Sequence, residues 1–349
     1  MIMIVFHHIV SSNYLLTTDF SLSQIRYNII VTWGKIWVNL FIFISWFYLI
    51  NDKQIFNIKK FIKLLFETFF YSIIIYFLFL LLWKANYYDI RTYIFPLTNK
   101  VWRFITVYIV LYLLHPIINR AIITLDKQTF KTILIILILW RIIIPTFSPT
   151  DWLDFSNELL RFITAYMIWG YIRLHTTLNH DNTKKHLTQW ISFFIITFLI
   201  NILISTIEAK SPINLPNRIH NIISVRTPYS LTILPSSIYL FTGFIQLKLK
   251  YNKYINIIAS TTFWIYLIHE HPLIKNILRH RRINLRDYEN LIIIIFYSVL
   301  IVIIIFISCA IIDLIRQYTI EKPFLILINK YIENIEKYAK KIISSVKIF

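Results

Sequence analysis

Long apolar segments alternate with short polar connections along the whole chain. A segment of about 20 apolar residues is long enough to cross a bilayer as a helix. Ten windows approach or reach this length: residues 1–16, 36–50, 61–83, 101–118, 130–147, 159–174, 187–207, 229–247, 255–274 and 291–315. The pattern predicts an all-α, polytopic integral membrane protein of about ten transmembrane helices.

The two ends of the chain differ from the middle. Window 1–16 is short for a span and has no basic region ahead of it, so we expect a first helix truncated at its N-terminus rather than a signal peptide. The C-terminal "KYIENIEKYAKKIISSVKIF" is typical of a basic amphipathic helix lying on a membrane surface. We therefore predict a transmembrane domain over residues 1–320 and a cytoplasmic tail over residues 321–349.

Composition agrees with a membrane location. Of the 349 residues, 57% are hydrophobic and 15% are charged, whereas a soluble domain carries about 25% charged residues. The net charge of +19 comes from short basic clusters between apolar windows, where Lys and Arg orient helices and contact lipid head groups. We expect the lipid bilayer as a partner and no nucleic acid, because no basic stripe with interleaved aromatic residues is present.

Basic residues also predict the orientation. Most of the Lys and Arg residues in alternate loops fall on the side that carries the two termini, so both termini are expected in the cytoplasm of a multi-pass cell-membrane protein. The segment "KNILRHRRINLR" opposes this choice, since it would then lie outside. The single cysteine, Cys309, rules out an intrachain disulfide and a cysteine-based metal cluster.

Two adjacent histidines, His7 and His8, interrupt the first apolar window. Neighbours on a helix point about 100° apart, so both cannot face one site. His8 shares a face with Ser11 and Ser12, and an imidazole is the natural general base for a hydroxyl near neutral pH. The alternative is a histidine that only hydrogen-bonds between helices.

Three further groups of polar residues have two interpretations each. Asn39 and Ser45 either line a site or link helices. Lys59, Lys60 and Lys63 either bind phosphates or simply mark the cytoplasmic side. His269, Glu270 and His271 lie at the end of a window, but histidines at i and i+2 do not share a helix face and no third ligand is evident, so we expect a hydrogen-bonding cluster and no metal.

Several stretches, taken in order, resemble acyltransferase family 3, the integral-membrane bacterial O-acyltransferases of exopolysaccharide, O-antigen and peptidoglycan. The stretches are "MIMIVFHH", "GKIWVNLFIFISWFYLI", "FPLTNKVWRFITVYIVLYLLHPIIN", "FSNELLRFITAYMIWGYIRLH" and "NKYINIIASTTFWIYLIHEHP". The resemblance implies transfer of an acyl group, commonly acetyl from acetyl-CoA, to a glycan hydroxyl. Acyl-CoA would act as donor substrate, with no permanently bound cofactor.

The resemblance also assigns residues. It places the family's essential first-helix histidine on His8, as general base or transient acyl carrier, and the family's basic residues after the second helix on Lys59, Lys60 and Lys63, as ligands of the donor phosphates. Asn39, Ser45, Tyr266 and His269 are further candidates for lining the site. The family arginine, ten intervening residues before the histidine, would fall upstream of Met1.

A second departure from the family concerns tryptophan. Five residues fall where the family pattern favours glycine: Trp33, Trp37, Trp46, Trp169 and Trp264. The chain has 3 Gly and 10 Trp, although glycine permits close helix approach in membranes. One hypothesis is a gene whose opal codons encode glycine but are translated here as tryptophan, and the alternative is compensated repacking.

Two other classes of protein share the apolar pattern. A polysaccharide transporter needs charged groups in several spans, and here mid-span charges look scarce, with Arg161 the clearest. A glycan polymerase is expected to carry a large external loop, which the short connections do not offer. Both observations favour the acyltransferase.

Overall fold

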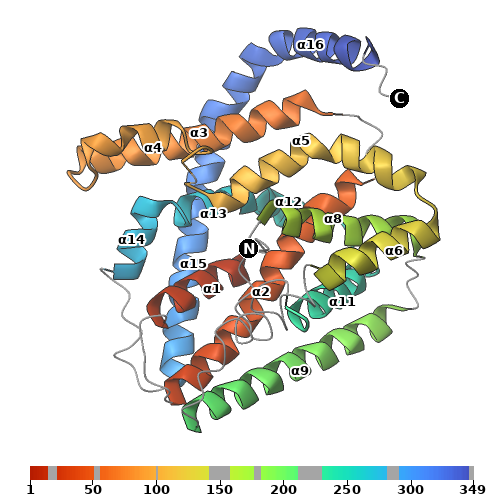
Figure 1. Cartoon of the computed structure of the whole chain (residues 1–349). Helices are drawn as coiled ribbons and strands as arrows, with labels where there is room; N and C mark the ends of the chain where they lie inside the picture. Colours follow the sequence, from red (N-terminus) through yellow and green to blue (C-terminus); the bar gives the residue numbers. More distant parts are fainter. Residues whose placement is uncertain are drawn as a thin grey trace. The chain divides into compact units, whose positions relative to one another are not determined.

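The computed structural model describes residues 1–14, 22–50, 56–99, 101–140, 158–176, 182–210, 230–280 and 291–345 (Figure 1). All regular structure in these ranges is helical, and no β-strand occurs in them. The predicted all-α fold is therefore confirmed. The chain forms two compact units, and each is described by itself below.

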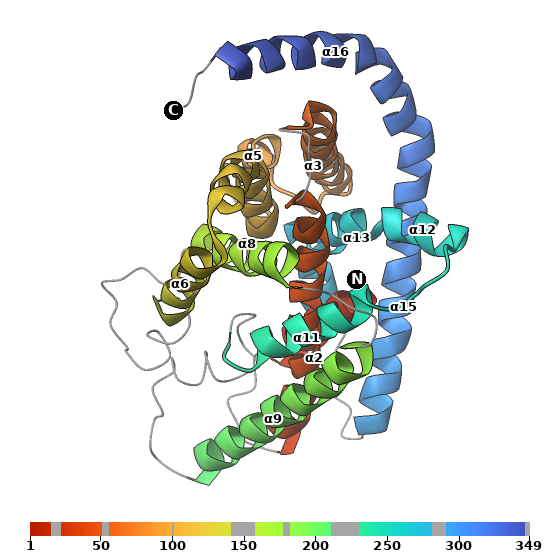
Figure 2. The same ribbon diagram turned by 90° about the vertical axis from the view of Figure 1, so that its right-hand side faces the viewer.

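The first unit comprises Met1–Asp52, Leu114–Tyr251 and Leu278–Ile303. Its helices are α1 (Ile2–Tyr14), α2 (Leu22–Leu49), α6 (Lys127–Ile138), α8 (Glu158–His175), α9 (Thr183–Lys210) and α11 (Ile233–Ile245). Helix α2 is the central element, since it packs against α1, α8, α9 and α11. Helices α9 and α11 lie side by side in both views (Figures 1 and 2).

The second unit comprises Lys53–Leu113, Asn252–Ile277 and Ile304–Phe349. Its elements are α3 (Ile58–Leu81), a 3-10 turn (Tyr87–Asp89), α4 (Ile90–Ile94), α12 (Lys253–Ser260), α13 (Thr262–His269), a π-helical segment η5 (Gln317–Glu321) and α16 (Lys322–Ser345). Helix α3 packs against α4, α13 and α16. Among the helices of the described residues, three have residues in both units: α5 (Arg103–Thr124), α14 (Pro272–His280) and α15 (Leu291–Arg316).

Side-chain caps explain where several helices begin. The Asn57 Oδ1 atom accepts a hydrogen bond from the Lys60 N–H at 2.9 Å, which starts α3. Asp126 caps α6 by accepting from the N–H groups of Gln128 and Thr129 at 2.8 and 3.0 Å. Such caps satisfy N–H groups that have no partner within the helix.

Among the described residues, three helical stretches are long and apolar enough to cross a membrane: Ile58–Leu81, Arg103–Thr124 and Ile295–Asn329. Gly34–Leu49 and Ile233–Ile245 are shorter apolar helices. The total of ten spans remains a prediction.

The window over residues 255–274 does not form the single helix that we expected. It is divided among α12, α13 and α14. The hydroxyls of Ser260, Thr261 and Thr262 each donate to a backbone carbonyl three residues earlier, at 2.7–2.8 Å. Such bonds compete with regular helical hydrogen bonding, and Pro272, which has no N–H, begins α14.

The end of α2 is held by side chains from neighbouring helices. The Asn119 amide donates to the Leu49 carbonyl at 2.8 Å, and its own oxygen accepts from the Tyr166 hydroxyl at 2.6 Å. The Arg173 guanidinium donates to the Phe47 carbonyl at 2.7 Å and lies 4.3 Å from the centroid of the Phe47 ring. These contacts satisfy carbonyls that the last turn of a helix leaves unpaired.

Candidate active site

The two histidines of α1 have different surroundings. His7 is 2% exposed and lies against Gly34 of α2, whereas His8 is half-buried. Their ring centroids are 5.7 Å apart and the ring planes are inclined by 50°, as expected for neighbours that project in different directions. The side chains of Ser11 and Ser12, which we expected to orient His8, lie outside the described residues.

Gly34 permits a close approach of α1 to α2. A Cβ atom at Gly34 would lie 2.1 Å from Cγ and 2.2 Å from Cβ of His7, so a residue with a side chain does not fit without movement of the helices. The Nδ1 atom of His7 is buried and has no hydrogen-bond partner in the described ranges. His7 is thus the packed imidazole, and His8 is the more exposed of the pair.

Asn39 and Ser45 lie further along α2. Asn39 is fully buried, and its amide donates to the Ser237 hydroxyl of α11 at 3.0 Å, while the Ser237 hydroxyl donates to the Ile233 carbonyl at 2.7 Å. Ser45 is half-buried, and its hydroxyl lies 3.4 Å from the Phe41 carbonyl of its own helix. Asn39 therefore links α2 to α11, which is the helix-linking interpretation of this residue.

The three predicted phosphate ligands lie in the first two turns of α3. Lys59 and Lys60 are exposed, and they flank the N-terminus that Asn57 caps. A helix N-terminus attracts negative charge, because the unpaired N–H groups of the first turn point out of the helix and the positive end of the helix dipole lies there. Lys63 instead forms ion pairs with Glu67, at 3.7 Å, and with Glu321, so its charge is already balanced by carboxylates.

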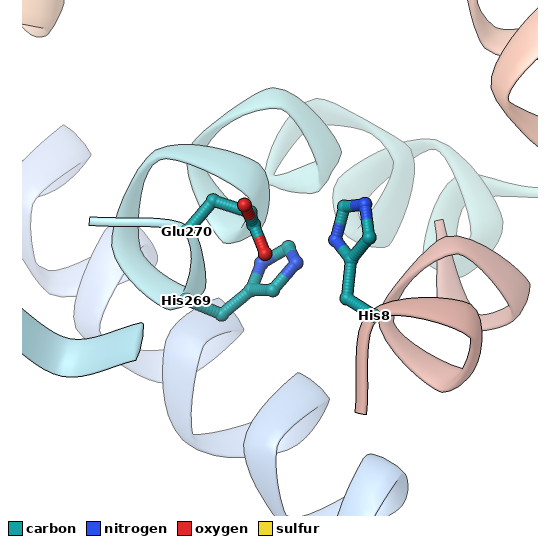
Figure 3. Close-up of side chains that lie close together, drawn as sticks. All are labelled: His8, His269 and Glu270. Carbon is teal, nitrogen blue, oxygen red and sulfur yellow. The ribbon is translucent and has the colours of Figure 1, made fainter. Parts of the chain in front are cut away.

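Tyr266 and His269 lie on α13, and Figure 3 shows His269 and Glu270 at the C-terminal end of this helix. His269 is 2% exposed and its Nδ1 atom contacts the Ile265 carbonyl. Because a carbonyl only accepts, Nδ1 carries a proton, and in the neutral form of the ring Nε2 is then the acceptor. Glu270 is ion-paired with Lys275. His8, also drawn in Figure 3, belongs to α1 of the first unit.

The structure also shows buried charges that sequence reasoning missed. Glu67 lies in α3, and Asp313 and Arg316 lie in α15, all within helices able to span a membrane. Only Arg161 was singled out from the sequence, and these three residues were not named there. The signal was present in the sequence, since Glu67 and Asp313 interrupt two of the apolar windows.

Three of the tryptophans at family glycine positions are buried: Trp46, Trp169 and Trp264. The Trp169 indole packs between the rings of Phe43 and Phe241, at centroid distances of 4.6 and 4.5 Å. Its N–H group is buried without a hydrogen-bond partner in the part of the chain described. The side chain of Trp33 lies outside the described residues.

A comparison with protein families now bears on these helices. A family profile described as "Acyltransferase domain" matches residues 1–312. The chain belongs to acyltransferase family 3. No curated protein and no solved structure gave a match.

Membership of acyltransferase family 3 confirms the resemblance found in the sequence. The matched range runs from α1 to the greater part of α15, and it therefore includes helices of both units. It ends before α16. The family is one of membrane-embedded acyltransferases, and the apolar helices able to span a bilayer agree with that location.

Proposed function

We propose that this family 3 acyltransferase moves an acyl group, with acetyl as the first choice, from acyl-CoA to a hydroxyl of a cell-surface glycan or its lipid-linked precursor. The family match over residues 1–312 carries the proposal. The half-buried His8 of the first unit and the exposed Lys59 and Lys60 of the second unit each support it, since an acyl transfer needs a base for the acceptor and cations for the donor phosphates.

In this proposal His8 acts on the acceptor hydroxyl. The neutral imidazole accepts the hydroxyl proton while the oxygen attacks the thioester carbonyl carbon. The carbon–sulfur bond then breaks, and CoA leaves as a thiolate that takes up the proton. The products are an O-acyl ester and free CoA. A variant of the scheme has His8 accept the acyl group first and pass it to the hydroxyl. Half-burial of His8 suits either role, because the ring must reach a substrate.

The donor phosphates would bind at the start of α3. Lys59 and Lys60 are exposed beside a capped helix N-terminus, and lysines bind phosphate as point charges. Lys63 would join them by exchanging a carboxylate partner for a phosphate. Asn39, Ser45, Tyr266 and His269 are proposed to line the path of the substrates.

The proposal places both termini and the CoA site in the cytoplasm. Cysteines introduced one at a time near Lys59 and near the C-terminus, in a Cys309→Ala background, would be labelled by a membrane-impermeant thiol reagent only in inverted vesicles. Labelling in right-side-out cells would contradict this orientation.

Transfer of labelled acetyl groups from acetyl-CoA to glycan tests the catalytic assignment. Membranes containing the wild-type chain are compared with His8→Ala and with the matched variant His7→Ala. We expect His8→Ala to lose transfer by about 100-fold or more, the usual contribution of a general base. His7→Ala should retain more transfer, because its loss affects packing against Gly34 rather than chemistry.

The opposite result would reassign the role. If His7→Ala abolishes transfer in a chain that still folds, and His8→Ala does not, then the buried imidazole is the base. Full activity in both variants would refute a histidine base in α1.

A further inference from the structure

A network of five ionisable side chains, four of them buried, lies in the second unit, on α3, on the end of α15 and on the π-helical segment. Its members are Lys63, Glu67, Asp313, Arg316 and Glu321. The side chains of Glu67, Asp313, Arg316 and Glu321 are at most 6% exposed, and Lys63 reaches the surface at 41%. Three carboxyl groups face two cations, so the fully ionised network carries one unbalanced negative charge.

Asp313 has the partners of an ionised carboxylate. Its Oδ1 atom accepts from Arg316 Nε at 2.9 Å and from the Tyr71 hydroxyl at 2.8 Å. Its Oδ2 atom accepts from Gln317 Nε2 at 2.7 Å. The Arg316 guanidinium also lies 4.9 Å from the centroid of the Trp264 ring. An ionised carboxylate only accepts hydrogen bonds, and these three donors supply what it accepts. The contacts of Asp313 are therefore those of its ionised form.

Glu67 and Glu321 share the remaining positive charge. Arg316 contacts Glu67 Oε1 through Nη2 at 3.3 Å and Glu321 Oε2 through Nη1 at 2.7 Å. Lys63 contacts both carboxyl groups as well. The two carboxyl groups therefore lie around the same two cations. A second negative charge close by disfavours ionisation of a carboxyl group, so a proton on one of the two relieves their repulsion.

The π-helical segment accounts for the position of Glu321. The Lys322 N–H donates to the Gln317 carbonyl, five residues earlier. With i→i+5 bonding, residues five apart come onto the same face, and Glu321 stands five residues after Arg316. In an α-helix these two side chains would diverge, since neighbours on one face are three or four residues apart. Segments of this kind often occur at functional sites.

We propose that Glu67 and Glu321 form a proton-binding site, in which one proton from solvent neutralises one of the two carboxyl groups. The proton brings the net charge of the five-residue network to zero. An unbalanced charge is costly inside an apolar helix pair, and both residues lie in stretches able to span a membrane. The site lies where α3 meets the junction of α15 and α16.

Infrared spectroscopy of the full chain in lipid vesicles tests the site. At about pH 8 ordinary carboxyl groups, with pKa values of roughly 4, are ionised, so a protonated-carboxyl C=O band reports an unusual site. We expect this band in the wild type, with a shift on exchange into D2O. Glu67→Gln and Glu321→Gln should each abolish it, because each removes one negative charge and leaves a neutral network. Glu158→Gln, at the start of α8, is the matched control and should retain it.

Three results would overturn the proposal. The first is a wild-type spectrum without the band at about pH 8, a result that does not depend on any variant. The second is a band that survives either glutamine substitution in protein that elutes as a single folded species. The third is a band that appears in choline buffer and disappears in sodium or potassium, which would show that a monovalent cation balances the charge instead.

Discussion

Gly34→Ala tests the close approach of α1 to α2, on which the position of the histidine pair depends. The new Cβ atom would lie 2.1–2.4 Å from Cγ, Cβ and Nδ1 of His7, whereas ordinary contact begins at 3.4 Å. The helices must therefore separate locally by up to about 1.3 Å. Rotation of the imidazole cannot relieve the contact, because Cβ and Cγ are at the root of the side chain.

Overpacking of this kind costs about 1–3 kcal/mol. Replacement of a helical glycine by alanine returns roughly 0.5–1 kcal/mol. We therefore expect Gly34→Ala to lose roughly 0–2.5 kcal/mol of stability, with a central value of about 1 kcal/mol, seen as a lower melting temperature in detergent. Acyl transfer should fall as well, because α1 carries His8.

Gly243→Ala is the matched control. Its Cβ atom would meet the tip of Leu187, with Cδ2 at 2.8 Å, and a leucine tip can move. This variant should melt close to the wild type. Equal stability and equal activity of Gly34→Ala and Gly243→Ala would refute the close α1–α2 contact.

Three other predictions concern separate parts of the molecule. Trp169→Gly should cost roughly 3–5 kcal/mol, as loss of a buried aromatic side chain does; a glycine variant more stable than the wild type, together with opal codons at the five tryptophan positions, would favour the recoding hypothesis. A side-chain hydrogen bond from Thr129, together with the backbone bonds, holds the pKa of Asp126 below its usual value. The wild type should therefore keep its full stability advantage over Asp126→Ala above about pH 4 and lose it as the pH falls through the lowered pKa. A difference in melting temperature that grows in acid would contradict this. The double variant Lys59→Gln/Lys60→Gln should raise the KM for acyl-CoA about tenfold, or 1.4 kcal/mol, with little change in kcat. The control variant Lys131→Gln, on α6, should leave KM unchanged. Equal KM values in the wild type, the double variant and the control would refute the phosphate site.

Local patterns predicted much of the fold. The apolar windows over residues 61–83 and 291–315 correspond to α3 and α15, because a run of apolar side chains specifies a helix that needs no distant partner to satisfy its backbone. The window over residues 255–274 failed for a local reason as well. Its hydroxyl side chains and Pro272 favour interruptions that hydropathy does not register.

The contacts of the buried charged network and of the histidine pair join residues that are distant in the sequence, so local patterns could not predict them. Tyr71 meets Asp313 across 242 residues, and Glu67 meets Arg316 across 249 residues. The packing of His7 on Gly34 likewise follows from the meeting of two helices. The scarcity of glycine was a usable clue, since one of only 3 glycines marks a close approach of α1 to α2.

The mass of the acceptor glycan, measured after incubation with acetyl-CoA and membranes that contain this chain, tests the central claim most directly. An acyltransferase predicts glycan heavier by whole acetyl groups, which mild alkali removes as ester-linked acetate, and an equal amount of free CoA. Glycan that is lengthened, or moved across the membrane, with no ester-linked acetate would contradict the claim and favour a polymerase or a transporter.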